Sequence, residues 1–394
     1  MQGWKMTLGL AALAVGAALV APRLFPMLGL APVPTAEAAS AAVEPTAPEP
    51  GVAEIPPPPP RTIDLVVALD TSGSMESLLD STRARLWDIV NEVDRQDPDA
   101  ILRVGLLTYG TPDYGADRHF VKVQMGLTED LDAVYSKAWE LRTNGGDEFV
   151  GAVIDHALAE MDWAPRDNSD NRRILFVAGN ETAQLGPIDF RSAAARAVGA
   201  NVIVNTLYAG DAAEGRTLHW DAVATAGNGR YLAIDARQSA VAVATPYDQQ
   251  LEHLNRQLNN TYVQYNHEGQ QKLRQILDND QAAGSLGAGS LASRIGTKGS
   301  AKHRVESWDL VEGLSTGSVK LEDVDATALP SELQGLGDVA LRAEVERKSA
   351  ERAQAKAEIK AIQAKRSAYL QEEAKNSAGA GLDEAMSDVL ADQL

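Results

Sequence analysis

Residues 63–75 read Ile-Asp-Leu-Val-Val-Ala-Leu-Asp-Thr-Ser-Gly-Ser-Met, and this stretch decides the fold. Its first seven residues are apolar except for Asp64, as expected of a strand that is buried on both faces. An aspartate, hydroxyl residues and a glycine follow at once. Apolar residues then recur at helical spacing from Met75 to Val93. The stretch therefore predicts a buried strand, a polar turn and an amphipathic helix in succession.

The same alternation continues along the chain. Further strands are predicted over 101–109, 119–127, 172–178, 201–208 and 230–234, and further helices over 131–141, 149–161, 190–198 and 218–226. Only 119–127 alternates between apolar and polar residues, as an edge strand does. The order predicts an α/β fold: a doubly wound, mostly parallel sheet with helices on both faces. Such sheets bind ligands at the carboxyl ends of their strands, which places the expected site in the turn after Leu69.

The composition excludes several kinds of site. The 394 residues carry a formal net charge of −19 and no cysteine. The negative charge argues against a nucleic-acid-binding protein and favours cationic partners or metal ions. Without cysteine the chain has no disulfide, zinc–thiolate site, iron–sulfur cluster or cysteine nucleophile.

The N-terminus indicates export. Lys5 precedes an apolar run from Leu8 to Pro22, and small residues around 36–42 are typical of a signal-peptidase site. Residues 1–30 are interpreted as a signal peptide, with a retained membrane anchor as the alternative, because the run is shorter than the roughly 20 residues of a bilayer helix. Residues 31–61 are rich in proline and alanine and are interpreted as a linker. We expect an exported protein, periplasmic or at the cell surface.

The turn after the first strand carries a D-x-S-x-S pattern formed by Asp70, Ser72 and Ser74. Hard divalent cations prefer oxygen ligands, and Mg²⁺ binds through few carboxylates while it keeps several waters. The bland alternative is a helix-capping turn, a common use of Asp and Ser. The pattern resembles that of the von Willebrand factor type A (VWA) family, and the resemblance extends over 62–245. It implies a metal-ion-dependent adhesion site (MIDAS), at which a carboxylate of a partner protein completes the metal shell.

Two further ligands of that family, a threonine in a later loop and an aspartate after the fourth strand, are not intact. Asp147 stands where the threonine is expected, and Ala178-Gly179-Asn180-Glu181 replaces Thr-Asp-Gly. In one interpretation Asp147 supplies the missing carboxylate, with Asn180 or Glu181 in the outer shell, and the site binds Mg²⁺, Mn²⁺ or Ca²⁺. In the other the site has lost its metal and the motif is structural. We favour the first, because neighbouring carboxylates without a cation are unfavourable.

These segments also resemble a bacterial exported subfamily with the Ala-Gly-Asn-Glu turn, which supports the fold more than a function. The most catalytic-looking cluster is His219-Trp220-Asp221, but consecutive residues point in different directions around a helix. We expect Trp220 to pack and His219 to cap the helix or face solvent. No G-x-S-x-G, H-E-x-x-H or phosphate-binding loop occurs in the sequence, so an enzyme of unknown class is the least favoured alternative.

The region 246–375 is predicted to be helical. Tyr247 to Tyr265 forms one amphipathic face, and 339–373 is a long charged helix. Arg352, Arg366 and Lys348 fall in the heptad seam of this second helix, which makes it a weak coiled coil. A helix lying along the domain, or an antiparallel hairpin with the earlier helix, are the alternatives. Residues 282–300, rich in Gly, Ala and Ser, are predicted to be a mobile loop, 305–336 to mix short apolar stretches with turns, and 376–394 to be a disordered tail.

The leading hypothesis is a non-enzymatic protein-interaction module of the bacterial cell envelope, an adhesion or scaffold domain that binds a partner carboxylate through a divalent metal. Asp70, Ser72 and Ser74 would be ligands, directly or through water, with Asp147 as the substitute. The alternative is a metal-free scaffold that binds its partner through the C-terminal helices.

Overall fold

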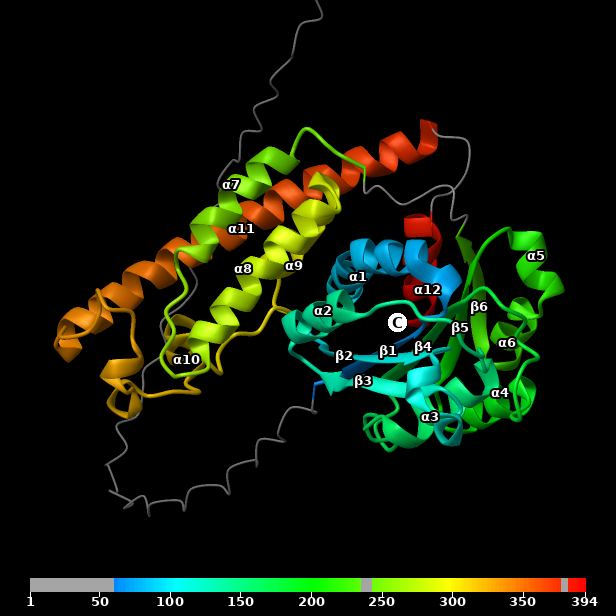
Figure 1. Ribbon diagram of the computed structural model, residues 1–394. Helices are drawn as coiled ribbons and strands as arrows, with labels where there is room; N and C mark the ends of the chain where they lie inside the picture. Colours follow the sequence, from blue (N-terminus) through cyan, green and yellow to red (C-terminus); the bar gives the residue numbers. More distant parts are fainter. Residues whose placement is uncertain (1–59, 235–242, 377–381) are drawn as a thin grey trace, which may run out of the picture. The chain divides into compact units, whose positions relative to one another are not determined.

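The computed structural model describes residues 60–234, 243–376 and 382–394 and contains a six-stranded sheet (Figure 1). The strand order is β3-β2-β1-β4-β5-β6. All neighbouring strands are parallel except β2 and β3, which are antiparallel. The strands are β1 (Thr62–Asp70), β2 (Ile101–Tyr109), β3 (Val121–Thr128), β4 (Arg172–Gly179), β5 (Ile203–Ala209) and β6 (Asn228–Ile234). The predicted α/β fold is confirmed, and β3 is the edge strand that its alternation indicated.

Helices cover both faces of the sheet, as predicted (Figure 1). Successive side chains of β1 point to opposite faces of the sheet and enter two separate cores. Leu65 and Leu69 lie in one core, and Val66 and Ala68 lie in the other. The first core is closed by α1 (Glu76–Gln96), α2 (Leu131–Glu140) and α12 (Leu382–Gln393). The second is closed by α3 (Val150–Glu160), α4 (Phe190–Gly199) and α6 (Trp220–Ala226), and the short α5 is Ala212–Thr217. Helices cover both faces of β1, so residues on both faces are buried. This explains why the strand is a continuous apolar run and does not alternate between apolar and polar residues.

The last helix differs from the predicted disordered tail. Met386, Val389 and Leu390 of α12 are buried in the core between α1 and the sheet. Gln393 exchanges side-chain hydrogen bonds of 2.8 and 2.9 Å with Asn205 of β5. The three apolar residues recur at helical spacing, a signal too short to outweigh the polar and small residues around them. The chain therefore leaves the sheet domain after β6 and returns to complete its core.

A helical region lies between these two points. Its helices are α7 (Asp248–Asn259), α8 (Gly269–Ser285), α9 (Ala288–Gly299), α10 (Leu310–Thr316) and α11 (Asp338–Asn376). Arg366 of α11 pairs with Asp248 at 3.1 Å, and Lys348 donates to the carbonyl of Asn260 at 2.8 Å. The order of these contacts makes α7 and α11 antiparallel, which is the hairpin alternative, and α11 has the predicted extent.

Residues 282–300 form the end of α8 and the whole of α9 rather than the predicted mobile loop. Small residues allow α9 to lie close against α1 and α11. Asn91 of α1 donates to the carbonyl of Ser293 at 2.8 Å and accepts from Thr297 at 2.8 Å. The composition that indicated a loop is here the composition of a closely packed helix. The amphipathic face that begins at Tyr247 is also shorter than predicted, because α7 ends at Asn259 and Tyr262 and Tyr265 lie beyond it.

The stretch predicted to mix apolar residues and turns contains α10 and two single-turn 3₁₀ helices, Leu321–Asp323 and Ala326–Ala328. The heptad seam of α11 is mostly buried against helices of the same chain. Its two arginines find buried acids: Arg352 binds Asp309, and Arg366 binds Asp248.

The predicted signal or anchor at 1–30 lies outside the described residues, as does nearly all of the linker. Within the residues that the structure describes, no helix is both long and apolar enough to cross a membrane.

We predict that Leu390→Ala lowers the free energy of unfolding by about 2–4 kcal/mol, the usual loss when a fully buried leucine is truncated. Leu390 is 0% exposed. Urea unfolding followed by circular dichroism measures the change. Asp388→Ala, on the exposed side of the same helix, is the control and should change stability little. Equal stability of Leu390→Ala and wild type would mean that α12 does not belong to the core.

Candidate metal-ion site

The carboxyl end of β1 brings three of the predicted site residues together. Asp70 is the last residue of the strand and is 0% exposed. The backbone N–H of Ser72 donates to Asp70 Oδ1 at 2.7 Å, and the hydroxyls of Ser72 and Ser74 lie 3.3 Å apart. Asn180, from the turn after β4, donates to the Ser74 hydroxyl at 3.0 Å. One carboxylate, two hydroxyls and an amide thus share the edge of the sheet at which parallel strands are expected to hold a ligand.

The turn is held in place from two sides. Thr71 donates both its backbone N–H and its hydroxyl to the carbonyl of Tyr109 in β2, at 2.8 and 2.9 Å. The backbone N–H of Asn144 donates to the carbonyl of Thr71 at 2.9 Å. The second contact brings the loop between α2 and α3 to the turn.

This loop places Glu148, rather than Asp147, beside Asp70. Glu148 is buried, with 8% of its surface exposed, and its carboxylate interacts with Ser72 and with the charge of Asp70. Asp147 is exposed, and no contact joins it to Asp70 among the described residues. The spacing from the Gly-Gly pair indicated Asp147, whereas the neighbouring Glu148 is the residue that the structure places beside Asp70.

Gly110 makes room for this arrangement. It has a φ of +83°, and a Cβ there would lie 2.7 Å from Asp70 Oδ1 and 3.1 Å from Glu148 Cγ. A side chain at this position would displace both carboxylates. Residue 110, which follows β2, must therefore be a glycine for both carboxylates to keep their places.

The surroundings of Gly179 explain why the aspartate that the family has at this position is absent here. A Cβ on Gly179 would lie 2.5 Å from the Tyr109 hydroxyl and 2.9 Å from the Trp220 ring. Tyr109 is buried and donates its hydroxyl to the carbonyl of Ala178 at 3.0 Å. An aspartate cannot fit at residue 179 while Tyr109 and Trp220 stand there. The carboxylate absent from β4 has a counterpart in Glu148, on the opposite side of the turn.

Among the described residues, no basic side chain acts on the carboxylates of Asp70 and Glu148. Burial raises the pKa of Asp70 to about 6, against hydrogen bonds from Ser72, and the charge of Glu181 adds to the increase. Burial raises the pKa of Glu148 to about 7, and the charges of Asp70 and Glu181 raise it further. Oδ2 of Asp70 is buried and has no hydrogen-bond partner among the described residues. A cation would supply what these groups lack.

The donor set fits a divalent cation bound through few carboxylates. Asp70 and Glu148 offer charged oxygens, and Ser72 and Ser74 offer hydroxyls, which is the chemistry that Mg²⁺ or Mn²⁺ prefers. Glu181 is exposed and suits an outer position, and Asn180 reaches the site through Ser74. No three histidine, aspartate or glutamate side chains in the described parts of the chain are gathered closely enough to hold a metal by themselves. Hydroxyls, waters and a partner would have to complete the shell.

The residues of the catalytic-looking triplet have structural roles. Trp220 is buried, as predicted, and its indole N–H donates to the carbonyl of Glu181 at 2.8 Å, which fixes the turn after β4. His219 precedes α6 with a left-handed φ of 70° and lies against Phe190.

We predict that Glu148→Gln stabilises the metal-free protein at high pH. Folded Glu148 keeps a proton between about pH 4.5 and 7 that the unfolded chain releases, so stability falls as the pH rises through this window. The variant should exceed wild type by about 1–2 kcal/mol at pH 8 and match it at pH 4. Urea unfolding in the presence of a chelator at both pH values measures this difference. Asp147→Asn is the matched control and should follow the wild-type profile; parallel profiles for Glu148→Gln and wild type would contradict the placement of Glu148.

Residues 64–231 match the family model of the von Willebrand factor type A domain. No curated protein sequence matches the chain. Among solved structures, the chain is similar to proximal thread matrix protein 1 from the mussel byssus, at 13% identity over 46% of this chain and 43% of that one, with a TM-score of 0.34. This chain thus spans less than half of the mussel protein, another structure of which has a zinc-occupied MIDAS motif. The chain is also similar to the conserved hypothetical protein BatB from Bacteroides thetaiotaomicron, at 16% identity over 44% of this chain and 90% of that one, with a TM-score of 0.34. Residues 64–231 thus match the von Willebrand factor type A family model and lie in a six-stranded, mostly parallel sheet of the VWA-like fold.

Proposed function

We propose that this protein binds a protein partner through a divalent cation held at the carboxyl end of β1. VWA domains are in general non-catalytic interaction modules. The observation that carries the metal-dependent form of this function is the buried Asp70 carboxylate, whose Oδ2 has no partner among the described residues and which lies beside the buried Glu148. A buried and unpaired charge is costly unless a ligand compensates it.

In this proposal each residue of the site has a distinct role. Asp70 and Glu148 hold the cation by charge, Ser72 and Ser74 complete its protein ligands directly or through water, and Asn180 orients Ser74. With few protein carboxylates the cation keeps open positions, and a carboxylate of the partner fills one of them. The N-terminal export signal or anchor predicted at 1–30, followed by its linker, would present the domain outside the cytoplasm of a bacterium.

The rim of the site indicates the charge of the partner. Exposed acids stand on the segments that follow β2, α2, β4 and β5 at this edge: Asp113, Asp147, Glu181, Asp211 and, in the first turn of α5, Glu214. The basic residues at this edge contact neighbouring groups. Arg142 donates to the carbonyls of Trp139 and Leu141. Lys122, Arg191 and Arg216 lie over the rings of Tyr114, Phe190 and Tyr231. A purely acidic partner would be repelled by this rim. We therefore propose a partner whose carboxylate is flanked by basic residues.

The scaffold alternative requires a binding surface outside the candidate metal site. It places binding on the C-terminal helices, and α11 does present a long exposed face to solvent. Deleting everything after β6 cannot test it, because α12 would be lost from the domain core with the rest. The two forms of the function must be compared in the full chain. Ser72→Ala removes one hydroxyl at the turn and changes no helix, so it should reduce partner binding only if binding depends on the metal site.

The first prediction of this proposal concerns the metal. We expect calorimetric titration of the chain from Arg61 with Mn²⁺ or Mg²⁺ to show one site, absent in Asp70→Ala. Glu148→Gln should weaken binding by about tenfold or more, since it removes a charged ligand. Asp147→Asn is the matched control and should bind nearly as wild type does. If wild type binds no cation, the turn is structural, and the scaffold alternative is favoured.

The second prediction concerns partner charge. With Mn²⁺ present, the peptide Ac-Lys-Gly-Asp-Gly-Lys-NH₂ should bind about tenfold more tightly than Ac-Glu-Gly-Asp-Gly-Glu-NH₂ at low salt, and the preference should shrink as salt screens the rim. Fluorescence anisotropy of labelled peptides measures both affinities. Glu214→Lys should reduce the preference, whereas Asp170→Lys, at the opposite end of the sheet, should not. A preference for the acidic peptide would overturn the role given to the rim.

A further inference from the structure

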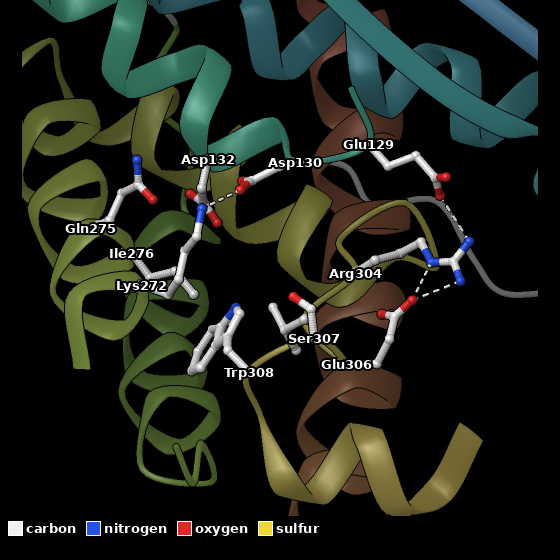
Figure 2. Close-up of a pocket in the computed structure, with 11 residues that line it drawn as sticks. Glu129, Asp130, Asp132, Lys272, Gln275, Ile276, Arg304, Glu306, Ser307 and Trp308 are labelled. Atoms are coloured by element: carbon white, nitrogen blue, oxygen red, sulfur yellow. Dashed lines mark hydrogen bonds and ion pairs between the residues drawn. The ribbon is translucent and has the colours of Figure 1, made fainter. Parts of the chain in front are cut away.

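A cavity of about 200 Å³ lies where the sheet domain meets the helical region, away from the candidate metal site (Figure 2). One wall comes from the turn into α2, with Glu129, Asp130 and Asp132. The other walls come from α8 and from the segment between α9 and α10. Residues more than a hundred positions apart in the sequence thus form one enclosure.

Ion pairs join the two regions across this cavity. Lys272 of α8 pairs with Asp130 at 2.5 Å, and Arg304 pairs with Glu129 at 2.8 Å. Figure 2 shows these two pairs on opposite sides of the space. Deeper in, Asp132 is buried and binds Arg294 at 2.7 Å and His303 at 2.8 Å, which compensates its charge within the protein. The buried contacts of Asp132 thus join α2 to α9 and to the segment after it beside the cavity.

The floor is apolar. Ile276, Val305 and Trp308 line the cavity, and they are 1%, 3% and 4% exposed. The Trp308 ring is packed against Tyr262, with centroids 5.6 Å apart. A rigid floor of this kind suits a short aliphatic chain, and an aromatic ring adds attraction for a cation placed against its face.

Two of the acids that line the cavity share a single counterion. The Arg304 guanidinium is shared between Glu129 and Glu306, which it contacts at 2.8 and 2.7 Å. Lys272 is engaged by Asp130, and Asp132 by Arg294 and His303. Oε2 of Glu306 is buried and has no hydrogen-bond partner in the described parts of the chain. One guanidinium between two carboxylates leaves an excess of one negative charge at this wall of the cavity.

We propose that this cavity binds a primary ammonium group on a short aliphatic chain. The ammonium would lie beside the carboxylates of Glu306 and Glu129 and balance the excess charge, while the chain lies on Ile276, Val305 and Trp308. The volume is below the 300 Å³ at which pockets for drug-sized ligands begin, so the occupant is small. A free alkylamine and a lysine side chain of a peptide share this chemistry. A carboxylate ligand does not fit, since both basic residues of the wall are already paired.

Nuclear magnetic resonance of the ¹⁵N-labelled protein tests the proposal. The indole N–H of Trp308, assigned with Trp308→Phe, reports occupation of the cavity. We expect n-butylammonium chloride to shift this resonance saturably, and sodium butyrate at the same ionic strength to leave it unmoved. The peptide Ac-Gly-Lys-Gly-NH₂ gives the second arm. Tighter binding of the amine or of the peptide identifies the source, and both results support the site.

Glu306→Gln should weaken binding of the better probe by about tenfold, the loss expected for one charge-assisted hydrogen bond. Glu322→Gln is the control: it makes the same substitution at an exposed position outside the cavity and should bind as wild type does. If Glu306→Gln does not fold, Glu129→Gln removes the other carboxylate that shares Arg304 and serves in its place. An equal response to butyrate, no response to either amine, or unchanged affinity in the glutamine variant would overturn the proposal.

Discussion

The burial of β1 on both faces is the constraint on which the rest of the structure depends. Two aspartates stand at the ends of this strand, and both are 0% exposed. Asp64 is fully satisfied: Arg103 binds both of its oxygens at 2.8 Å, and the backbone N–H of Ala164 donates to it. Asp70, at the carboxyl end, keeps one oxygen without a partner among the described residues. The same residue type in the same strand is thus structural at one end and available for a ligand at the other.

The helical region is fixed to this domain by buried charges. Arg294 and Lys298 of α9 are 0% exposed and share Asp280 of α8, and Arg294 also binds Asp132 of α2. Buried ion pairs add little net stability, because desolvation offsets their attraction, but a wrong register would leave their charges unpaired. Such pairs therefore specify how α8 and α9 dock more than they strengthen the docking. Arg352 and Arg366 have the same role on α11, where they stand in positions that a simple heptad would fill with apolar residues.

Local patterns in the sequence were sufficient for the sheet and for the turn at its edge. Each buried strand is an apolar run. The D-x-S-x-S pattern directly follows the first of these runs, which places it at the carboxyl end of β1. The features that sequence analysis missed depend on contacts between distant segments. The loop that carries Glu148 comes so close to the end of β2 that a Cβ on Gly146 would lie 2.5 Å from the Gly110 carbonyl oxygen. Gly179 has no room for a side chain beside Tyr109 and Trp220. The regions predicted to be a loop and a tail are helices because α1 and the sheet bury their small and apolar residues.

The short helix α2 lies between the cavity and the loop that reaches the candidate metal site. Its first turn carries Asp132 and borders the cavity that the helical region closes. Its last carbonyls, of Ala138 and Leu141, accept hydrogen bonds of 3.0 Å from Arg83 of α1, and the chain then runs directly into the loop that carries Glu148. Buried arginines thus hold both ends of α2, one of them from the helical region and the other from α1. Because the chain after β6 contacts α2 through α9 and completes the core of the sheet domain through α12, it is a structural part of that domain.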